Sequence, residues 1–283
     1  LKENVTGADN TAVGMDALQS NTSSSNTAVG KASLISNTTG GNNTSIGKDA
    51  LKCNTEGGQN VAIGKDTLFK NTTADNNTAL GQNAMFSNTT GASNTAVGRS
   101  ALFANTTAAN NTAVGTSSLI ANTTGEESVA VGSLSLDANT TGSYNNAVGH
   151  KALTTNTTGI KNQAFGHSAL ELNTTGAGNV AVGHKALEAN TTASDNTAVG
   201  FEAMLSNTTG AGNSAVGKNA LSKNTTADNN TAVGFESLKA NTTGTANVAV
   251  GKDALIANTT GANNTAVGMI AMNFNTTGGN NIA

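Results

Sequence analysis

Three histidines occupy equivalent places in a repeating pattern. His150, His167 and His184 are spaced 17 residues apart, and imidazole nitrogen is a common ligand of zinc and other transition metals. They are the candidate metal ligands of the chain. However, the same position of the pattern elsewhere holds Lys, Gln, Thr, Phe and Met. That variety favours a solvent-exposed column over a metal centre.

Three phenylalanines share another position in successive repeats. Phe69, Phe86 and Phe103 are also 17 residues apart. One hypothesis is a stripe that binds a glycan or an apolar partner. The favoured interpretation is a ladder of aromatic side chains that stack on one another across neighbouring strands.

The motif N-T-T recurs along the chain and matches the acceptor sequence for N-glycosylation. The possible glycosylation sites include Asn37, Asn71, Asn88, Asn105 and Asn122. However, Asn54 persists where Glu56 removes the motif, which indicates a structural reason for the Asn. The two adjacent Thr would point to opposite faces of a strand, which disfavours an ice-binding role for them.

Nothing in the sequence predicts catalysis or a cofactor. The histidines share one column, and the acidic residues are scattered over predicted turns, so no nucleophile, base and orienting acid recur together. The net charge of −3 comes without a basic stripe, which argues against nucleic-acid binding. No apolar run approaches the length of a membrane span, and Cys53 is alone, so no internal disulfide is expected.

A 17-residue unit, N-T-A-V-G-x-x-A-L-x-x-N-T-T-G-x-x, organises the whole chain. The Gly after the apolar triplet recurs every 17 residues from Gly30 to Gly268, and only the first interval, from Gly14, is 16. The missing residue lies in the turn Asn21–Asn26, which suggests a surface loop. Such a unit is too short for helical-pair repeats. It predicts an all-β parallel solenoid with one coil per unit, about 16 coils, running through 1–283 as a single array.

Each coil is expected to contain two strands, T-A-V and A-L-x-x-N-T-T, separated by turns with Gly. The Val and Leu columns, which are almost always aliphatic or Met, are predicted to stack inside the coil. The two Asn columns are predicted to form ladders of side-chain amides. Members of the ladders are Asn37, Asn54, Asn71, Asn88 and Asn105 in one and Asn43, Asn60, Asn77, Asn94 and Asn111 in the other.

The Ala column before Val varies only at Ser45. Because Ala points away from Thr and Val along a strand, its constancy indicates that this second face is buried too. Either a tight inner corner or another chain would bury it, and three chains meeting along this column would be an economical arrangement. The predicted buried face includes Ala62, Ala79, Ala96 and Ala113.

The N-T-A-V-G-x-x-A-L core resembles the repeats of trimeric autotransporter adhesin heads, and the full unit resembles arrays in bacterial and phage tail-fibre proteins. The resemblance implies a left-handed, trimeric β-roll in an extracellular structural or adhesive fibre, on a cell surface or virion. Leu1 and Ala283 both fall inside a unit, so a fragment of a longer, uncapped fibre is expected. The leading hypothesis is a non-catalytic shaft. The alternatives are a chain that polymerises end to end into a filament, with or without N-glycans, and a repetitive module for a glycan or cell-surface receptor.

Overall fold

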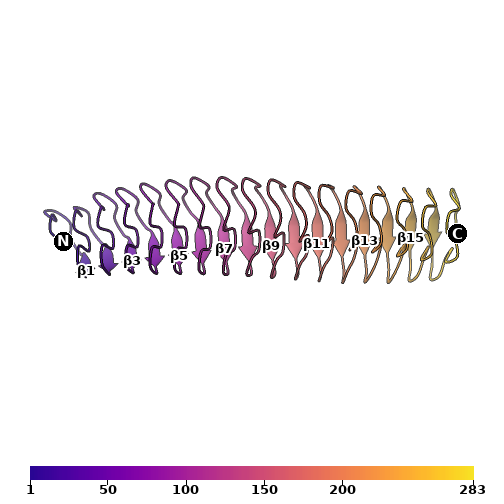
Figure 1. The fold of residues 1–283 in the computed structure, drawn as a ribbon, viewed down its shortest axis with the longest axis horizontal. Coiled ribbons are helices and arrows are strands. Elements are labelled where there is room, and N and C mark those ends of the chain that lie inside the picture. The colour runs from indigo at the N-terminus through magenta and orange to yellow at the C-terminus, as the bar shows by residue number, and fades with distance from the viewer. The chain divides into compact units, whose positions relative to one another are not determined.

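The computed structural model describes residues 1–283 as two compact units, Leu1–Tyr144 and Asn145–Ala283. Every regular element is a three-residue strand, and in each unit successive strands run side by side in the same direction (Figure 1). The first unit contains β1 (Thr11–Val13), β2 (Thr27–Val29), β3 (Thr44–Ile46), β4 (Val61–Ile63), β5 (Thr78–Leu80), β6 (Thr95–Val97), β7 (Thr112–Val114) and β8 (Val129–Val131). The second contains β9 (Asn146–Val148), β10 (Gln163–Phe165), β11 (Val180–Val182), β12 (Thr197–Val199), β13 (Ser214–Val216), β14 (Thr231–Val233), β15 (Val248–Val250) and β16 (Thr265–Val267).

The pairing is parallel and joins equivalent residues of consecutive repeats. Thr95 pairs with Thr112 and Ala96 with Ala113, for example. The register is kept across the shortened turn, as the pairing of Thr11 with Thr27 shows. The predicted parallel β-solenoid with one coil per 17-residue unit is therefore confirmed, and so is the placement of the missing residue in a turn.

The predicted second strand is wrong. In the A-L-x-x segment the Leu column has a left-handed backbone, with φ of 51° at Leu102, and so does the residue two positions earlier, with φ of 57° at Ser100. The segment is therefore a sequence of turns. It nevertheless bonds to the next coil, since the amides of Leu102 and Ala104 donate to the carbonyls of Ser118 and Ile120, each at 3.0 Å.

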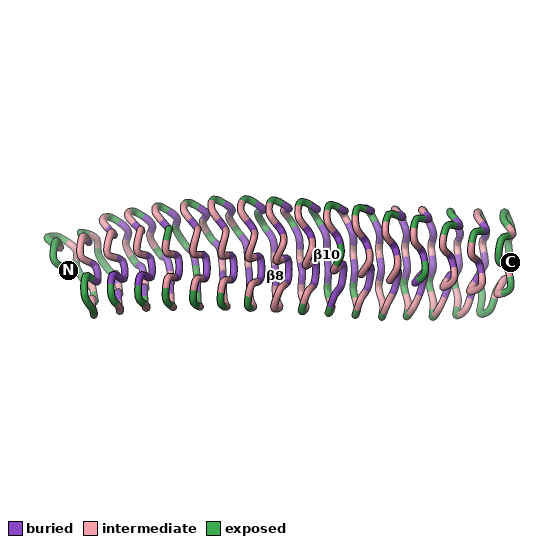
Figure 2. Tube along the Cα trace, in the orientation of Figure 1, coloured by how far each residue is buried: buried purple, intermediate pink, exposed green.

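Each coil buries one large apolar side chain, from the Leu column, and buried stretches recur along the Cα trace from coil to coil (Figure 2). Leu102 is fully buried, as predicted. The Val column, predicted to be inside, instead faces outward and is partly exposed, as at Ile46 (38%) and Leu80 (45%). The inward side of the strand holds Ala, or Ser at Ser45, because a close-packed interior leaves room beside the buried Leu and Asn for only a small side chain.

The Ala column is buried, but by its own chain. Ala62, Ala79, Ala96 and Ala113 are each 0% exposed, which confirms the predicted burial. The tight inner corner thus explains the constancy of Ala, and the column gives no support to a trimer. Ser45, the one exception, fits because its hydroxyl donates to the carbonyl of Ala50 at 3.0 Å and accepts from the Ser33 hydroxyl at 2.7 Å.

The Gly that ends each strand is required for two reasons. At Gly98 φ is 134°, a conformation that side chains rarely adopt. A Cβ atom there would also lie 2.5 Å from the carbonyl oxygen of Gly115 in the next coil. This column therefore sets both the bend of the chain and the close approach of consecutive coils.

Candidate functional site

The three histidines stack, but their nitrogens do not converge. Ring centroids are 5.3 Å apart for His150 and His167 and 5.2 Å apart for His167 and His184, with interplanar angles of 25° and 13°. Nearly parallel rings direct their nitrogen lone pairs in parallel planes rather than toward one point. No group of three or more His, Cys, Asp or Glu side chains is placed to hold a metal ion. The chemistry of this column is ring stacking.

The stack extends further than the sequence analysis predicted. The ring of Phe201 lies 5.2 Å from His184. Beyond it, the Lys218 ammonium lies 5.6 Å from the Phe201 ring and 6.0 Å from the Phe235 ring, and Lys252 lies 5.9 Å from Phe235. Such cation–π contacts contribute roughly 0.5–1 kcal/mol at exposed sites. The signal was present in the sequence, since these residues all directly follow the strand-ending Gly.

The predicted phenylalanine ladder is confirmed. Ring centroids are 5.0 Å apart for Phe69 and Phe86 and 5.3 Å apart for Phe86 and Phe103, with near-parallel planes. Lys52 and Lys70 lie over Phe69 and Phe86 at 5.4 and 5.6 Å. Because the rings cover one another's faces, a sugar would find mainly ring edges here, so the geometry favours the structural ladder over a glycan-binding stripe.

The first Asn ladder, in the N-T-T motif, joins side-chain amides directly. The Nδ2 atom of Asn105 donates to Oδ1 of Asn88 in the preceding coil at 2.8 Å and to the carbonyl of Ala108 at 3.0 Å. Both amide hydrogens are therefore used inside the coil, and the side chain is fully buried. The predicted ladder of amides is confirmed for this column.

The second Asn ladder, in the N-T-A motif, connects side chains mainly to backbone. The Oδ1 atom of Asn94 accepts from the backbone N–H of Asn111 at 2.9 Å, and the Nδ2 atom of Asn94 donates to the carbonyl of Ala108 at 2.9 Å. Each such Asn thus bonds to the residue that ends the N-T-T turn of the next coil and to the residue that precedes the strand of that coil. Asn is needed because both an acceptor and a donor are used.

The same geometry bears on N-glycosylation. Asn37, Asn71, Asn88, Asn105 and Asn122 are each 0% exposed, and the Nδ2 atoms that would carry sugar donate to neighbours in the interior. A glycan on these nitrogens has no exit from the folded coil. The first Thr of the motif is structural too, since the Thr106 hydroxyl donates to the carbonyl of Thr123 at 3.2 Å.

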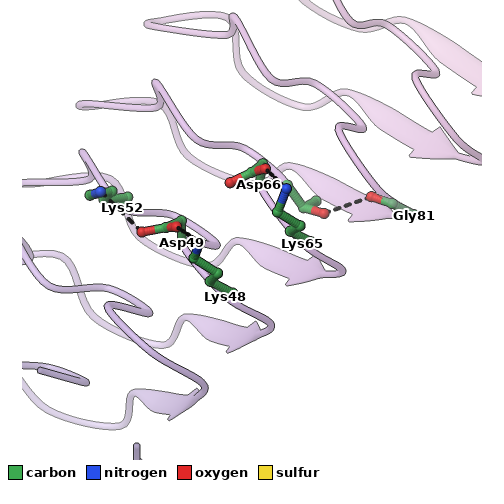
Figure 3. A network of polar contacts seen from close by, with 7 residues as sticks. Lys48, Asp49, Lys52, Lys65, Asp66 and Gly81 are labelled. Atoms are coloured by element: carbon green, nitrogen blue, oxygen red, sulfur yellow. Dashed lines mark hydrogen bonds and ion pairs between the residues drawn. The ribbon is translucent and has the colours of Figure 1, made fainter. Parts of the chain in front are cut away.

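Ion pairs form on the turns that follow the strands (Figure 3). Asp49 lies 3.0 Å from Lys52 and 3.7 Å from Lys48, and Asp66 lies 3.1 Å from Lys65. In the second unit, hydrogen bonding to Lys239 lowers the pKa of Glu236. These contacts lie at the surface, where each is worth little.

Cavities, membrane spans and the single cysteine were the remaining places for a functional site. The surface has no pocket, and no helix in the structure has the length and apolar character that a bilayer span requires. Burial raises the pKa of the Cys53 thiol, although Lys52 and Lys70 act in the opposite direction.

The chain matches no known family model and no curated protein. The features from which a function can be argued are therefore the stacked side-chain ladders and the columns of exposed residues that the coils share.

Proposed function

We propose that this chain is the shaft segment of an extracellular fibre, with a mechanical and non-catalytic role. The observation that carries the proposal is the continuity of bonding from coil to coil. In the coil that begins at Asn94, the strand, the Leu segment and the N-T-T turn all bond to the next coil, and the Asn105 amide bonds to the preceding one. Such repetition suits a stiff element whose length is set by the number of repeats.

The composition of the interior supports the same role. Buried Ala, Leu and Asn columns repeat with hardly any change, whereas the exposed positions after the strand vary freely among Lys, His, Phe and Met. A recognition site would instead require particular side chains at particular coils. The variable positions are consistent with a shaft whose surface tolerates change.

The location can be tested with an antibody raised against the purified chain. Immunogold labelling of the source cells or virions is expected to decorate filaments outside the envelope. Label confined to the cell interior would refute the extracellular assignment. The mechanical role is tested separately by stretching single molecules, for which we expect unfolding in equal steps of one coil; loss of structure at negligible force would refute it.

A further inference from the structure

The outer side of each strand presents two columns that contain no charged residue. In the first unit one column is Thr11, Thr27, Thr44, Val61, Thr78, Thr95, Thr112 and Val129, and the other is Val13, Val29, Ile46, Ile63, Leu80, Val97, Val114 and Val131. We call this surface the Thr/Val face. Its side chains are partly exposed, and none points into the coil. Contiguous exposed apolar surface of this kind marks a contact site.

The variation within the face indicates what kind of contact it makes. The second column is aliphatic in every coil of both units except for Phe165. The first column is mostly Thr, with Val in some coils and the polar residues Asn146, Gln163 and Ser214 in the second unit. Apolar character is thus kept strictly in the second column, whereas the hydroxyl of the first column is not. A lattice of ordered water would need repeated hydroxyls, so the pattern favours packing against apolar protein surface.

The row spacing of the face is matched by a second copy of this chain. Its rows repeat at the strand spacing of about 4.8 Å, and only a surface with the same repeat can match them row for row. The molecule itself carries that surface. We propose that two copies of this chain pack face to face through the Thr/Val face, with the β-branched side chains of one between those of the other, as in packed sheets.

Charges at the edges of the face determine the orientation. In the first unit, the residue after the strand-ending Gly is basic in four coils, at Lys31, Lys48, Lys65 and Arg99, and uncharged in the others. The residues before the strands give the other edge the acidic residues Asp9, Asp75, Glu126 and Glu127. Lys48 and Lys65 are partly neutralised by Asp49 and Asp66. If the two coil axes ran antiparallel, the acidic edges would meet. A two-fold axis along the stack of coils instead places each acidic edge against the partner's basic edge and brings equivalent coils together.

The geometry of the face also fixes the number of copies. A single face that packs against its own equivalent makes an isologous, two-fold contact. A three-fold arrangement would need two different faces on each copy. We therefore infer a dimer in place of the trimer expected from the Ala column, whatever the location of the protein.

The size of the face predicts how strong the contact is. Eight strands at about 4.8 Å and three residues at about 3.3 Å give each unit a face of roughly 40 by 10 Å, or about 400 Å². That is half of the roughly 800 Å² per partner found in stable complexes. Each unit carries these columns and can contact the equivalent unit of the second copy, so we expect a dimer that becomes weaker when either unit is removed.

Light scattering on the full chain tests the proposal. The wild type is expected at twice 27.9 kDa. Replacement of Val97, Val114, Val216 and Val233 by Lys should raise the dissociation constant at least tenfold, because ammonium groups would enter the apolar contact. The matched control replaces Thr90, Thr107, Thr209 and Thr226, which are exposed at the turns, by Lys and should remain dimeric. Circular dichroism confirms that both variants keep the fold.

Charge exchange tests the orientation. Asp75→Lys should weaken the dimer, and the added changes Lys65→Glu and Arg99→Glu should restore it, because Asp75 lies within one coil of the partner's Lys65 and Arg99 in the parallel arrangement. A wild-type mass of one or three chains would overturn the proposal. It would also be overturned if the Val variant stayed dimeric, or if the Thr control dissociated as readily. Failure of restoration would overturn the parallel orientation.

Discussion

Turns that end in glycine differ from turns that end in alanine at the same position of the repeat. In the coil closed by Gly91, the amides of Thr89 and Thr90 both donate to the carbonyl of Thr106, at 2.9 and 3.2 Å. In the next coil, closed by Ala108, only the Thr106 amide bonds to Thr123, and that bond lengthens to 3.2 Å. The coils closed by Ala74, Ala193 and Ala227 likewise keep one bond, at 3.1 Å.

The cause is one methyl group. A Cβ atom at Gly125 would approach the carbonyl oxygen of Gly142 in the next coil to 2.4 Å, so a coil with Ala here must open slightly. Ala stands at this position in four turns, whereas the Gly that ends each strand is never replaced. The difference shows that a close contact alone can be relieved by movement, whereas a close contact combined with a positive φ cannot.

The largest effect is expected from Gly98→Ala. Both the positive φ and the contact with Gly115 oppose a side chain there, so we expect a loss of about 4 kcal/mol in local stability, combining backbone strain with overpacking. Hydrogen exchange of the amides in the flanking coils measures it, because unfolding of a repeat array is not a single two-state event.

Gly91→Ala is the matched control for that prediction. A Cβ atom at Gly91 would also meet a carbonyl of the next coil, that of Ala108, but Gly91 has no positive φ. The expected loss is below about 1 kcal/mol, the scale of one hydrogen bond, since Ala stands at the equivalent position of four other turns. Equal losses at Gly98 and Gly91 would show that the backbone conformation adds nothing.

A smaller but still large effect is expected from Asn105→Ala. The change leaves Oδ1 of Asn88 without its donor and removes the acceptor of one Nδ2 hydrogen of Asn122, whereas the carbonyl of Ala108 keeps its bond from Asn94. Each unsatisfied buried group costs about 1–3 kcal/mol. We expect a loss of about 3 kcal/mol, measured by hydrogen exchange of Thr89 and Thr106. Thr107→Ala, at the exposed neighbouring position, should change little; a similar loss there would contradict a role specific to the ladder.

Much of this organisation followed from the sequence, because repeats within one chain show which columns tolerate change. The period, the parallel register, the buried Leu and Ala columns and the Asn ladders are all consequences of that constraint. Whether the Val column faces the interior or the solvent could not be predicted in this way. Strand alternation places Thr and Val opposite Ala, but it does not say which side is inside.

The burial of the columns shows which side is inside. The Leu column and the two Asn columns are buried, the inward strand position holds Ala or Ser45, and the aliphatic column lies outside. Likewise, the turns at Leu102 were missed because Leu, unlike Gly or Asn, does not signal a positive φ. Burial in the core stabilises a backbone conformation that the residue type alone disfavours.

Ala108→Gly tests the comparison of turns directly. Removing the methyl group should let Thr107 bond to the Thr123 carbonyl and shorten the bond from Thr106. The gain is expected to be about 0.5–1 kcal/mol, the scale of one hydrogen bond, less the added flexibility of Gly in the unfolded chain. Slower exchange of the Thr106 and Thr107 amides would measure it, and Gly91→Ala should do the opposite at Thr89 and Thr90. Unchanged exchange in both variants would mean that the turns do not differ in strength.

The smallest effect is expected from a side-chain pair that lies outside this backbone framework. Glu236 lies 2.9 Å from Lys239, and its hydrogen bond to Lys239 lowers its pKa from the ordinary value of 4.5. A lowered carboxyl pKa stabilises the fold above pH 4.5, and this contribution is lost as the pH falls through the folded-state pKa. Glu236→Gln should therefore cost a few tenths of a kcal/mol at pH 7, since exposed pairs contribute little, and nothing at pH 2. An equal difference between variant and wild type at both pH values would show that the charge of Glu236 is not the cause.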